Sequence, residues 1–286
     1  MEKEIIIAEH AGFCYGVKRA VDITVNQQLT EGLTTYTLGP LIHNNDMIKY
    51  LVEQNIVPLE ETEIDRLSSG DSIVIRSHGV TPEMISRLEQ TGARVVDATC
   101  PYVYAIQKKV RKYRDLGYQI IIVGDSRHPE VIGINGWCDN SAIITKDGSD
   151  ITEYPNKVCV VSQTTERLSN YEKVVALVSR HCKEVITFNT ICKATTDRQN
   201  SADEVSKIVD IMIVVGGRNS SNSKKLYEIC NRNCKNTIFI ENCDELDDSI
   251  FKNNNINKVG ITAGASTPNF VIQQVVAKIK SNLLRS

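Results

Sequence analysis

The feature that most constrains the fold of this chain is the regular alternation of short β-rich runs with helical patterns. Nine such runs, among them "SIVIRSHG", "QIIIVGDSRH" and "VDIMIVVGGRNSS", each end in a polar or glycine-containing corner. The segments between them carry apolar residues at the spacing of an amphipathic helix. This alternation predicts an α/β protein with parallel sheets.

The corners repeat along the chain with a period near 90 residues. In each repeat one strand ends at a lone cysteine, and these cysteines are separated by 86 and 92 residues: Cys14, Cys100 and Cys192. The next strand ends in a glycine that is followed four positions later by a polar residue: His43, His128 and Ser220. A third corner carries His78, Gln163 and Ser266. Such weak internal similarity predicts three αβα repeats, over residues 1–93, 94–183 and 184–286.

The placement of the corners suggests how the repeats are arranged. Open α/β sheets bind ligands at the carboxyl ends of their strands. We therefore expect the repeats to form a cloverleaf around a pseudo-threefold axis, with these strand ends inward. The corners would then line one central cavity.

Composition limits the partners of the chain. Among 286 residues, 33 basic and 35 acidic side chains give a net charge of -2. This balance argues against nucleic acid and against an anionic membrane as partners, and it favours a small-molecule ligand. The N-terminal apolar run, residues 5–8, is too short for a signal peptide or a membrane span, so we expect a cytoplasmic protein.

Nine cysteines favour metal ligation or thiol chemistry, because an odd number in a reducing compartment does not suggest a disulfide framework. Cys14, Cys100 and Cys192 share one position in the repeat, and threefold packing would bring their thiolates to one point. Three sulfur ligands fit a [4Fe-4S] cluster whose fourth iron is open to substrate, and zinc with three cysteines and one histidine is the alternative. Each cysteine taken alone fits a small buried apolar residue equally well.

The remaining cysteines lack this placement. Cys159 lies inside the apolar run "VCVV" and is expected in the core. Cys230 and Cys234 are one helical turn apart with Cys243 nearby, which raises a second zinc hypothesis without an evident fourth ligand.

Polar residues at the corners suggest a site for phosphate. The histidines His43, His78 and His128 stand where a strand ends and a helix begins, and there they join the backbone N–H groups of the helix start. The third repeat supplies hydroxyl and amide donors instead: Ser220, Ser221, Asn222 and Ser266. A ring of such donors fits a diphosphate. For each residue taken singly, helix capping is an equally good interpretation.

An acid and a hydroxyl stand at two corners of the second repeat. Glu130 follows His128 and Pro129 in the first turn of an expected helix, and a nearby metal or anion would shift its pKa, so it is a candidate proton donor. The alternative is an ordinary acid that interacts with the helix dipole. Thr164, in "SQTTER", either caps a helix or hydrogen-bonds a substrate hydroxyl.

Read together, the motifs resemble one known family. The segments "GFCYGVKRAV", "SHGV", "DATCP", "HPEV", "SQTT", "CKATTDRQ", "NSSNS" and "TAGAS" follow the order found in the LytB or IspH family of 4-hydroxy-3-methylbut-2-enyl diphosphate reductases. The resemblance covers residues 5 to about 270. It implies a cloverleaf of three αβα domains and a [4Fe-4S] cluster held by Cys14, Cys100 and Cys192. It also implies that the substrate diphosphate is bound by His43, His78, His128, Ser220, Ser221, Asn222 and Ser266.

The resemblance further implies a reductive dehydroxylation, the last step of the methylerythritol phosphate route to isoprenoids. Two electrons would come from a ferredoxin or flavodoxin, Glu130 would deliver protons and Thr164 would orient the substrate hydroxyl, giving isopentenyl and dimethylallyl diphosphates. His128 would lie beside Glu130 at the reacting centre.

Two other classes of function remain open at this level. A dehydratase similar to quinolinate synthase also combines a threefold fold with three cysteines around a cluster, but it would need donors suited to a dicarboxylate. A redox sensor that carries a cluster, or a binding module held together by zinc, would give Glu130 and Thr164 no role.

Overall fold

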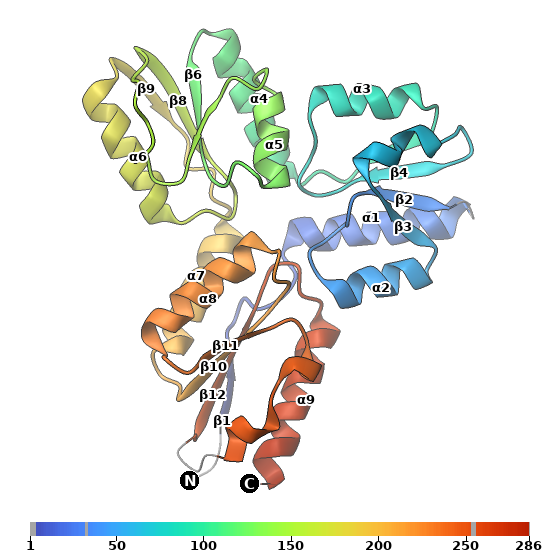
Figure 1. The fold of residues 1–286 in the computed structure, drawn as a ribbon, viewed down its shortest axis with the longest axis vertical. Helices are drawn as coiled ribbons and strands as arrows, with labels where there is room; N and C mark the ends of the chain where they lie inside the picture. The colour runs from blue at the N-terminus through green and yellow to red at the C-terminus, as the bar shows by residue number, and fades with distance from the viewer. Residues whose placement is uncertain (1–3, 32–33, 253–255, 286) are drawn as a thin grey trace. The chain divides into compact units, whose positions relative to one another are not determined.

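The structure is a computed structural model that describes residues 4–31, 34–252 and 256–285. It contains three four-stranded sheets in which every strand pair is parallel, with helices against the sheets (Figure 1). The predicted α/β class with parallel sheets is confirmed. None of the helices in the described part of the chain has an apolar stretch of the length needed to cross a bilayer.

The sheet formed from the two ends of the chain has the strand order β1-β12-β10-β11. Its strands are β1 (Glu4–Ile7), β12 (Lys258–Ala263), β10 (Ile211–Val215) and β11 (Thr237–Ile240). Helix α9 (Asn269–Arg285) packs on one face, and α7 (Lys193–Ser206) and α8 (Ser221–Asn233) pack on the other. All five residues of β10 are buried, as is typical of a central parallel strand covered on both faces.

The second sheet has the order β3-β2-β4-β5. It contains β3 (Ile56–Leu59), β2 (Thr35–Leu38), β4 (Ser72–Ile75) and β5 (Arg94–Asp97). The same part of the chain contains the helices α1 (Tyr15–Glu31), α2 (Asn45–Glu53) and α3 (Pro82–Gln90) and the 3-10 helix η1 (Glu61–Arg66).

The third sheet has the order β7-β6-β8-β9. Its strands are β7 (Ile143–Thr145), β6 (Gln119–Val123), β8 (Lys157–Ser162) and β9 (Glu184–Thr187). The helices α4 (Pro101–Asp115) and α5 (Pro129–Gly136) pack against one face, and α6 (Leu168–His181) packs against the other. Alternation along β6 divides the core, because Ile120 and Ile122 face α4 while Ile121 and Val123 face α6.

The sheets divide the chain one strand later than the predicted repeats. β5, which begins the predicted 94–183 repeat, pairs with β4, and β9, which begins the 184–286 repeat, pairs with β8. β1 pairs with β12 rather than with the 1–93 repeat. The reason is that each of these strands completes one sheet before the chain crosses to a helix of the next. The three crossings occur at Cys14, Cys100 and Cys192.

By compactness the chain forms two units. Compact unit 1 comprises Met1–Lys18, Ile42–Leu51 and Lys193–Ser286, and contains the sheet of β1, β12, β10 and β11. Compact unit 2 comprises Arg19–Leu41 and Val52–Cys192, and contains the other two sheets. The site residues are therefore described within each unit.

Helices begin cleanly at several corners. Thr81, Cys100 and His128 have extended backbone angles, and each is followed by a proline at the first helical position. The fixed φ of proline suits that position, where its missing N–H costs no helical hydrogen bond. The sequence therefore fixes the point at which each corner turns from strand to helix.

Candidate functional site

A buried acid and a hydroxyl form the centre of the corner in compact unit 2. Glu130, in the first turn of α5, is 3% exposed, and Thr164, just after β8, is 8% exposed. The Thr164 backbone N–H donates to Glu130 Oε1 at 2.6 Å, and the Thr164 hydroxyl donates to Glu130 Oε2 at 2.7 Å. Two donors on one residue fix the carboxylate in place. The lone pairs of the Thr164 oxygen can then accept a hydrogen bond from a ligand hydroxyl.

His128 is linked to the same acid. Its Nδ1 accepts a hydrogen bond from the backbone N–H of Glu130 at 3.1 Å. The proton of a neutral His128 ring therefore lies on Nε2, and the ring donates through that nitrogen. The capping contact uses Nδ1, whereas donation to a ligand would use Nε2–H, so the structural and functional interpretations of His128 are compatible.

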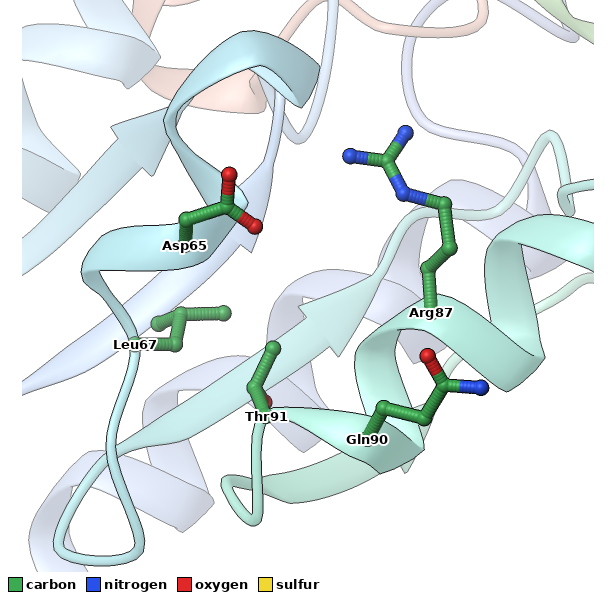
Figure 2. Close-up of a pocket in the computed structure, with 5 residues that line it drawn as sticks. All are labelled: Asp65, Leu67, Arg87, Gln90 and Thr91. Carbon is green, nitrogen blue, oxygen red and sulfur yellow. The ribbon is translucent and has the colours of Figure 1, made fainter.

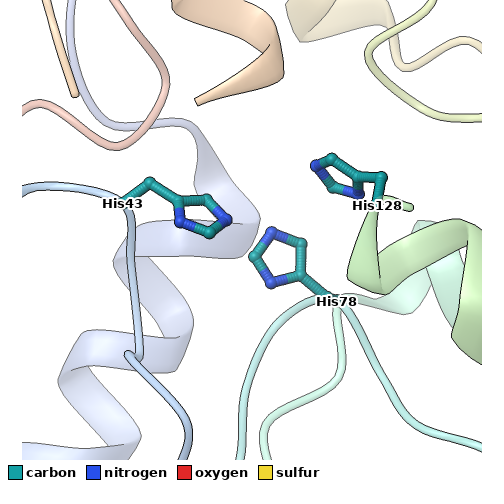
Figure 3. Close-up of side chains that lie close together, drawn as sticks. All are labelled: His43, His78 and His128. Carbon is teal, nitrogen blue, oxygen red and sulfur yellow. The ribbon is translucent and has the colours of Figure 1, made fainter. Parts of the chain in front are cut away.

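His78 lies against His128. The two ring centroids are 5.3 Å apart with an interplanar angle of 79°, an edge-on contact that Figure 3 shows. His78 is half-buried in the turn between β4 and α3, next to Gly79, whose φ is +69°. A side chain at Gly79 would strike the amide of Gln107, so only glycine fits there. His43, which Figure 3 also labels, belongs to compact unit 1.

The backbones of two cysteines hold the loops of this corner. The N–H of Cys100 donates to the Ser77 carbonyl at 3.0 Å, beside His78. The N–H of Cys192 donates to the Thr164 carbonyl at 2.9 Å. Each crossing point is thus tied by one hydrogen bond to a loop that carries another candidate residue.

The three crossing cysteines differ in burial from the core cysteines. Cys14, Cys100 and Cys192 are half-buried, and each immediately precedes a helix. In compact unit 1 the N–H of Cys14 donates to the Ala265 carbonyl at 3.2 Å, and its Sγ accepts from the Val17 N–H at 3.5 Å. Partly exposed thiols can reach a metal ion, whereas thiols enclosed in the core cannot. The donor set therefore fits a cluster or metal with sulfur ligands.

The second zinc hypothesis is wrong. Cys230 and Cys234 are buried on the face of the sheet that α7 and α8 cover, whereas Cys243 packs with the core on the α9 face. The Cys230 thiol points to the Ala202 carbonyl at 3.7 Å, and burial raises its pKa to about 12. Burial likewise raises the pKa of Cys159 to about 12, in the core as expected. These thiols are packing residues.

The polar corner of compact unit 1 lies at the start of α8. Ser220 caps this helix, its hydroxyl accepting from the Ser223 N–H at 3.3 Å, and Ser221 is the first helical residue. Asn222 is 2% exposed, and neither its amide oxygen nor its amide nitrogen has a hydrogen-bond partner among the described residues. An unpaired buried amide costs roughly 1 to 3 kcal/mol, so this side chain is suited to a ligand that supplies the missing partners.

Ser266 and His43 meet at the same corner. The Ser266 hydroxyl donates to the His43 carbonyl at 3.3 Å. A Cβ on Gly217 would overlap that carbonyl, and a Cβ on Gly216 or Gly264 would overlap the Ser223 hydroxyl. Gly217 therefore permits the end of β10 to lie this close to the loop of His43, and Gly216 and Gly264 permit the ends of β10 and β12 to lie close to the first turn of α8.

A cavity of about 250 Å³ lies elsewhere in compact unit 2 (Figure 2). Its lining residues are Asp65, Leu67, Arg87, Gln90 and Thr91. They come from η1, from the last turn of α3 and from the residue directly after each, whereas His78 precedes the first turn of α3. The cavity is therefore at the opposite end of α3 from the corner, and none of the predicted site residues lines it.

One buried residue near a crossing was missed at the sequence level. Arg198, in α7, is 3% exposed and donates to the Gly12 carbonyl at 2.8 Å, two residues before Cys14. It also donates to the Ala194 carbonyl at 2.9 Å. The available signal was a lone arginine within "CKATTDRQ", where the helix is otherwise formed of small and polar residues.

Comparison with known proteins gives a consistent result. The family model described as LytB protein matches residues 5–280. A 4-hydroxy-3-methylbut-2-enyl diphosphate reductase of Clostridium perfringens strain 13 is 52% identical over 280 residues, covering 98% of this chain and 99% of the relative. One of Clostridium tetani is 53% identical over 282 residues, which is 98% of this chain and 44% of that longer protein.

Solved structures agree. A structure described as (E)-4-hydroxy-3-methyl-but-2-enyl diphosphate reductase, the terminal enzyme of the non-mevalonate pathway, is 40% identical, with a TM-score of 0.72 over 98% of this chain and 99% of that one. The E-1-hydroxy-2-methyl-but-2-enyl-4-diphosphate reductase of Plasmodium falciparum is 28% identical, with a TM-score of 0.88 over 97% of this chain and 88% of that one.

Proposed function

Because the chain belongs to the LytB protein family, we propose that it reduces 4-hydroxy-3-methylbut-2-enyl diphosphate to isopentenyl and dimethylallyl diphosphates. It is an enzyme of the non-mevalonate pathway, and its substrate is a small diphosphate. The reaction consumes two electrons and two protons. The allylic C–O bond breaks, one proton completes the departing water and the other is added to the allylic carbon skeleton. The alternative similar to quinolinate synthase is set aside.

The observation that carries this proposal is the pair of Glu130 and Thr164. A protonated Glu130 would pass its proton through the Thr164 hydroxyl to the oxygen of the substrate, which leaves as water. While Glu130 is a carboxylate, the Thr164 hydroxyl donates to it, and the Thr164 oxygen would accept a hydrogen bond from the substrate hydroxyl. Once Glu130 is protonated both bonds would reverse, so that Glu130 donates to the Thr164 oxygen and the Thr164 hydroxyl donates to the substrate oxygen. Because both residues are nearly excluded from solvent, the proton has a defined route.

A metal cofactor accompanies this activity, and we propose a [4Fe-4S] cluster ligated by Cys14, Cys100 and Cys192. Their partial burial and their positions at helix starts support this ligand set over the core cysteines. When bound, such a cluster supplies single electrons and a Lewis-acidic iron. Zinc would supply a Lewis acid but no electrons.

We propose that the substrate diphosphate is held by three histidines and four neutral donors: His43, His78, His128, Ser220, Ser221, Asn222 and Ser266. The amide of Asn222, which has no hydrogen-bond partner among the residues that the structure describes, supports this assignment most directly. Nε2–H of His128 and the serine hydroxyls are donors of the kind that bind phosphate oxygens.

Electrons must come from outside the chain, and we propose a ferredoxin or flavodoxin as the source. We also propose that the reaction takes place in the cytoplasm, where these reduced carriers and reduced thiols persist.

Anaerobic purification followed by iron and sulfide analysis tests the cofactor. Incubation with the hydroxymethylbutenyl diphosphate and dithionite, with product detection by mass spectrometry, tests the reaction. We expect about four irons and four sulfides per chain, as the proposed cluster requires, and turnover to both products. A colourless zinc protein, or a cluster protein inert toward this substrate, would contradict the proposal.

A further inference from the structure

Helix α4 carries a concentration of positive charge that the proposed chemistry does not use. Its fifteen residues include five basic side chains and one acid, in a chain whose net charge is -2. Arg114 is neutralised by Asp139 at 3.0 Å and Asp115 at 3.4 Å, and Lys109 is half-buried over the Phe188 ring.

Three cations of this helix remain exposed. Lys108, Arg111 and Lys112 lie on the solvent side of α4, at the spacing of successive helical turns. Within the described residues none of the three forms an ion pair with a carboxylate. We call these three residues the α4 basic face.

Aromatic rings limit the freedom of this face. The ammonium of Lys108 lies 4.4 Å from the centroid of Tyr104, and the guanidinium of Arg111 lies 5.9 Å from the centroid of Trp137. Contacts of this kind reduce the entropy that a partner would otherwise have to remove when it binds. The face is therefore partly organised before any partner arrives.

The α4 basic face is close to a proposed cluster ligand. Helix α4 begins directly after Cys100, so Lys108 lies about 12 Å along the helix axis from that residue at 1.5 Å per residue. Tyr102 and Tyr104 are 56% and 42% exposed and continue the surface toward the helix start. Tyrosine and arginine are both enriched at protein interfaces.

We infer that the α4 basic face, with Tyr102 and Tyr104, is the docking surface for an acidic one-electron carrier protein. This inference rests on the proposed function, which requires two electrons per turnover from outside the chain. Each encounter would oxidise one reduced carrier by one electron, and two encounters would serve one substrate. Because the chain as a whole is slightly negative, a local positive face is needed to attract and orient an acidic partner.

The α4 basic face is exposed because the opposite side of the helix is apolar and buried. Val103, Ile106 and Val110 are buried against the sheet on the opposite side of α4. The cations thus contribute little to packing and can be changed without opening the core.

Charge reversal tests the inference in the complete holoenzyme. The triple variant K108E/R111E/K112E is compared with wild type and with the control K173E/R180E/K183E, whose residues are exposed on and just after α6, against the other face of the same sheet. Reduced acidic ferredoxin is one electron source, and dithionite is the other.

We expect the α4 variant to lose about tenfold or more in kcat/KM for the ferredoxin at low ionic strength, while its dithionite-driven turnover stays within about twofold of wild type. The neutral variant K108Q/R111Q/K112Q should have a kcat/KM for the ferredoxin between those of wild type and the charge-reversed variant. The α6 control should have the kcat/KM of wild type. Added salt should slow wild type toward the rate of the charge-reversed variant.

Equal ferredoxin-driven rates and equal salt dependence in wild type and the α4 variant would overturn the inference. The inference would also be overturned if the α4 basic face bound an RNA oligomer or phosphatidylserine vesicles while the charge-reversed variant kept the ferredoxin-driven turnover of wild type. If wild type showed no turnover with dithionite, that result would contradict the proposed function rather than the docking surface.

Discussion

The corner at Glu130 in compact unit 2 and the corner at Asn222 in compact unit 1 share one plan, in which a strand ends and a helix begins. Their buried polar groups are satisfied in opposite ways. Both oxygens of Glu130 receive hydrogen bonds from Thr164, whereas neither amide atom of Asn222 has a partner among the described residues. The first corner is complete without a ligand and suits chemistry, and the second is incomplete and suits binding.

The largest effect is expected from Glu130→Gln. An amide cannot deliver a proton, and its NH2 group would face the donors of Thr164 on one side. We expect kcat with dithionite to fall by about 100-fold to 10,000-fold, with cluster content and pyrophosphate affinity nearly unchanged. Glu166→Gln is the control, since Glu166 is another buried carboxylate, which accepts from Asn170 at 3.1 Å. Full activity of Glu130→Gln would remove this acid from the reaction.

Asn222→Leu should weaken ligand binding and stabilise the unliganded protein. Affinity for inorganic pyrophosphate, measured by calorimetry, should fall by about 10-fold to 100-fold, because a hydrogen bond to a charged group is lost. The unliganded protein should become more stable in urea by roughly 1 kcal/mol, since the unpaired amide is replaced by an apolar group of similar shape.

Asn44→Leu is the matched control for Asn222→Leu. Asn44 is also 2% exposed, but its Oδ1 accepts from the Met47 N–H at 2.9 Å. This variant should lose about 1 kcal/mol of stability. If Asn222→Leu were destabilising to a similar degree, Asn222 would be a structural residue and the comparison between the corners would fail.

Gly217→Ala should affect compact unit 1 through packing alone. The added methyl would overlap the His43 carbonyl, so we expect a loss of about 1 to 3 kcal/mol in the free energy of unfolding. Gly70→Ala in compact unit 2 is the control, because a Cβ there meets no atom within 4 Å. A Gly217 variant as stable as the Gly70 variant would show that the corner can relax.

The smallest effect is expected for alkylation of the core thiols, which belong to neither corner. Burial raises the pKa of Cys159 and Cys230 to about 12, so both thiols stay protonated at pH 8. Iodoacetamide followed by mass spectrometry should modify Cys14, Cys100 and Cys192 in the apoprotein and leave these two intact. Rapid modification of Cys159 in the folded protein would contradict its burial.

The same shifts set a direction for stability against pH. Each folded-state pKa lies above the value of about 8.5 for an unfolded cysteine, so the contribution of burial is fully present below that pH. It decreases as pH rises from about 8.5 toward 12, which urea unfolding across this range would measure.

Local patterns in the sequence were sufficient for the class of fold and for the corners. Apolar runs and helix-start prolines are local signals, so strands such as β6 and helix starts such as Cys100 to Pro101 were predictable. Which sheet a strand joins is not a local property. The apolar run of β5 is the same whether it pairs with β4 or begins a new sheet, and for this reason the predicted boundary at 93 precedes the observed crossing.

The site shows the same division. The residue types at the corners were evident, but the hydrogen bonds of Thr164 to Glu130 join positions 34 residues apart and depend on how β8 and α5 pack. Helical spacing placed Cys230 and Cys234 on one side of α8 correctly. It could not show that Cys243 lies beyond the sheet from them, against α9.

The pairing of β1 with β12 has a consequence for how the protein is made. Glu4 is in register with Lys258, so β1 has no partner until the end of the chain has been synthesised. The strands of compact unit 2 are complete much earlier, once residue 187 has emerged from the ribosome. Domains fold as their residues emerge, so compact unit 2 can form while the N-terminal strand is still without its partner. Because Cys14 donates to Ala265, its corner is the last of the three cysteine corners to close during synthesis.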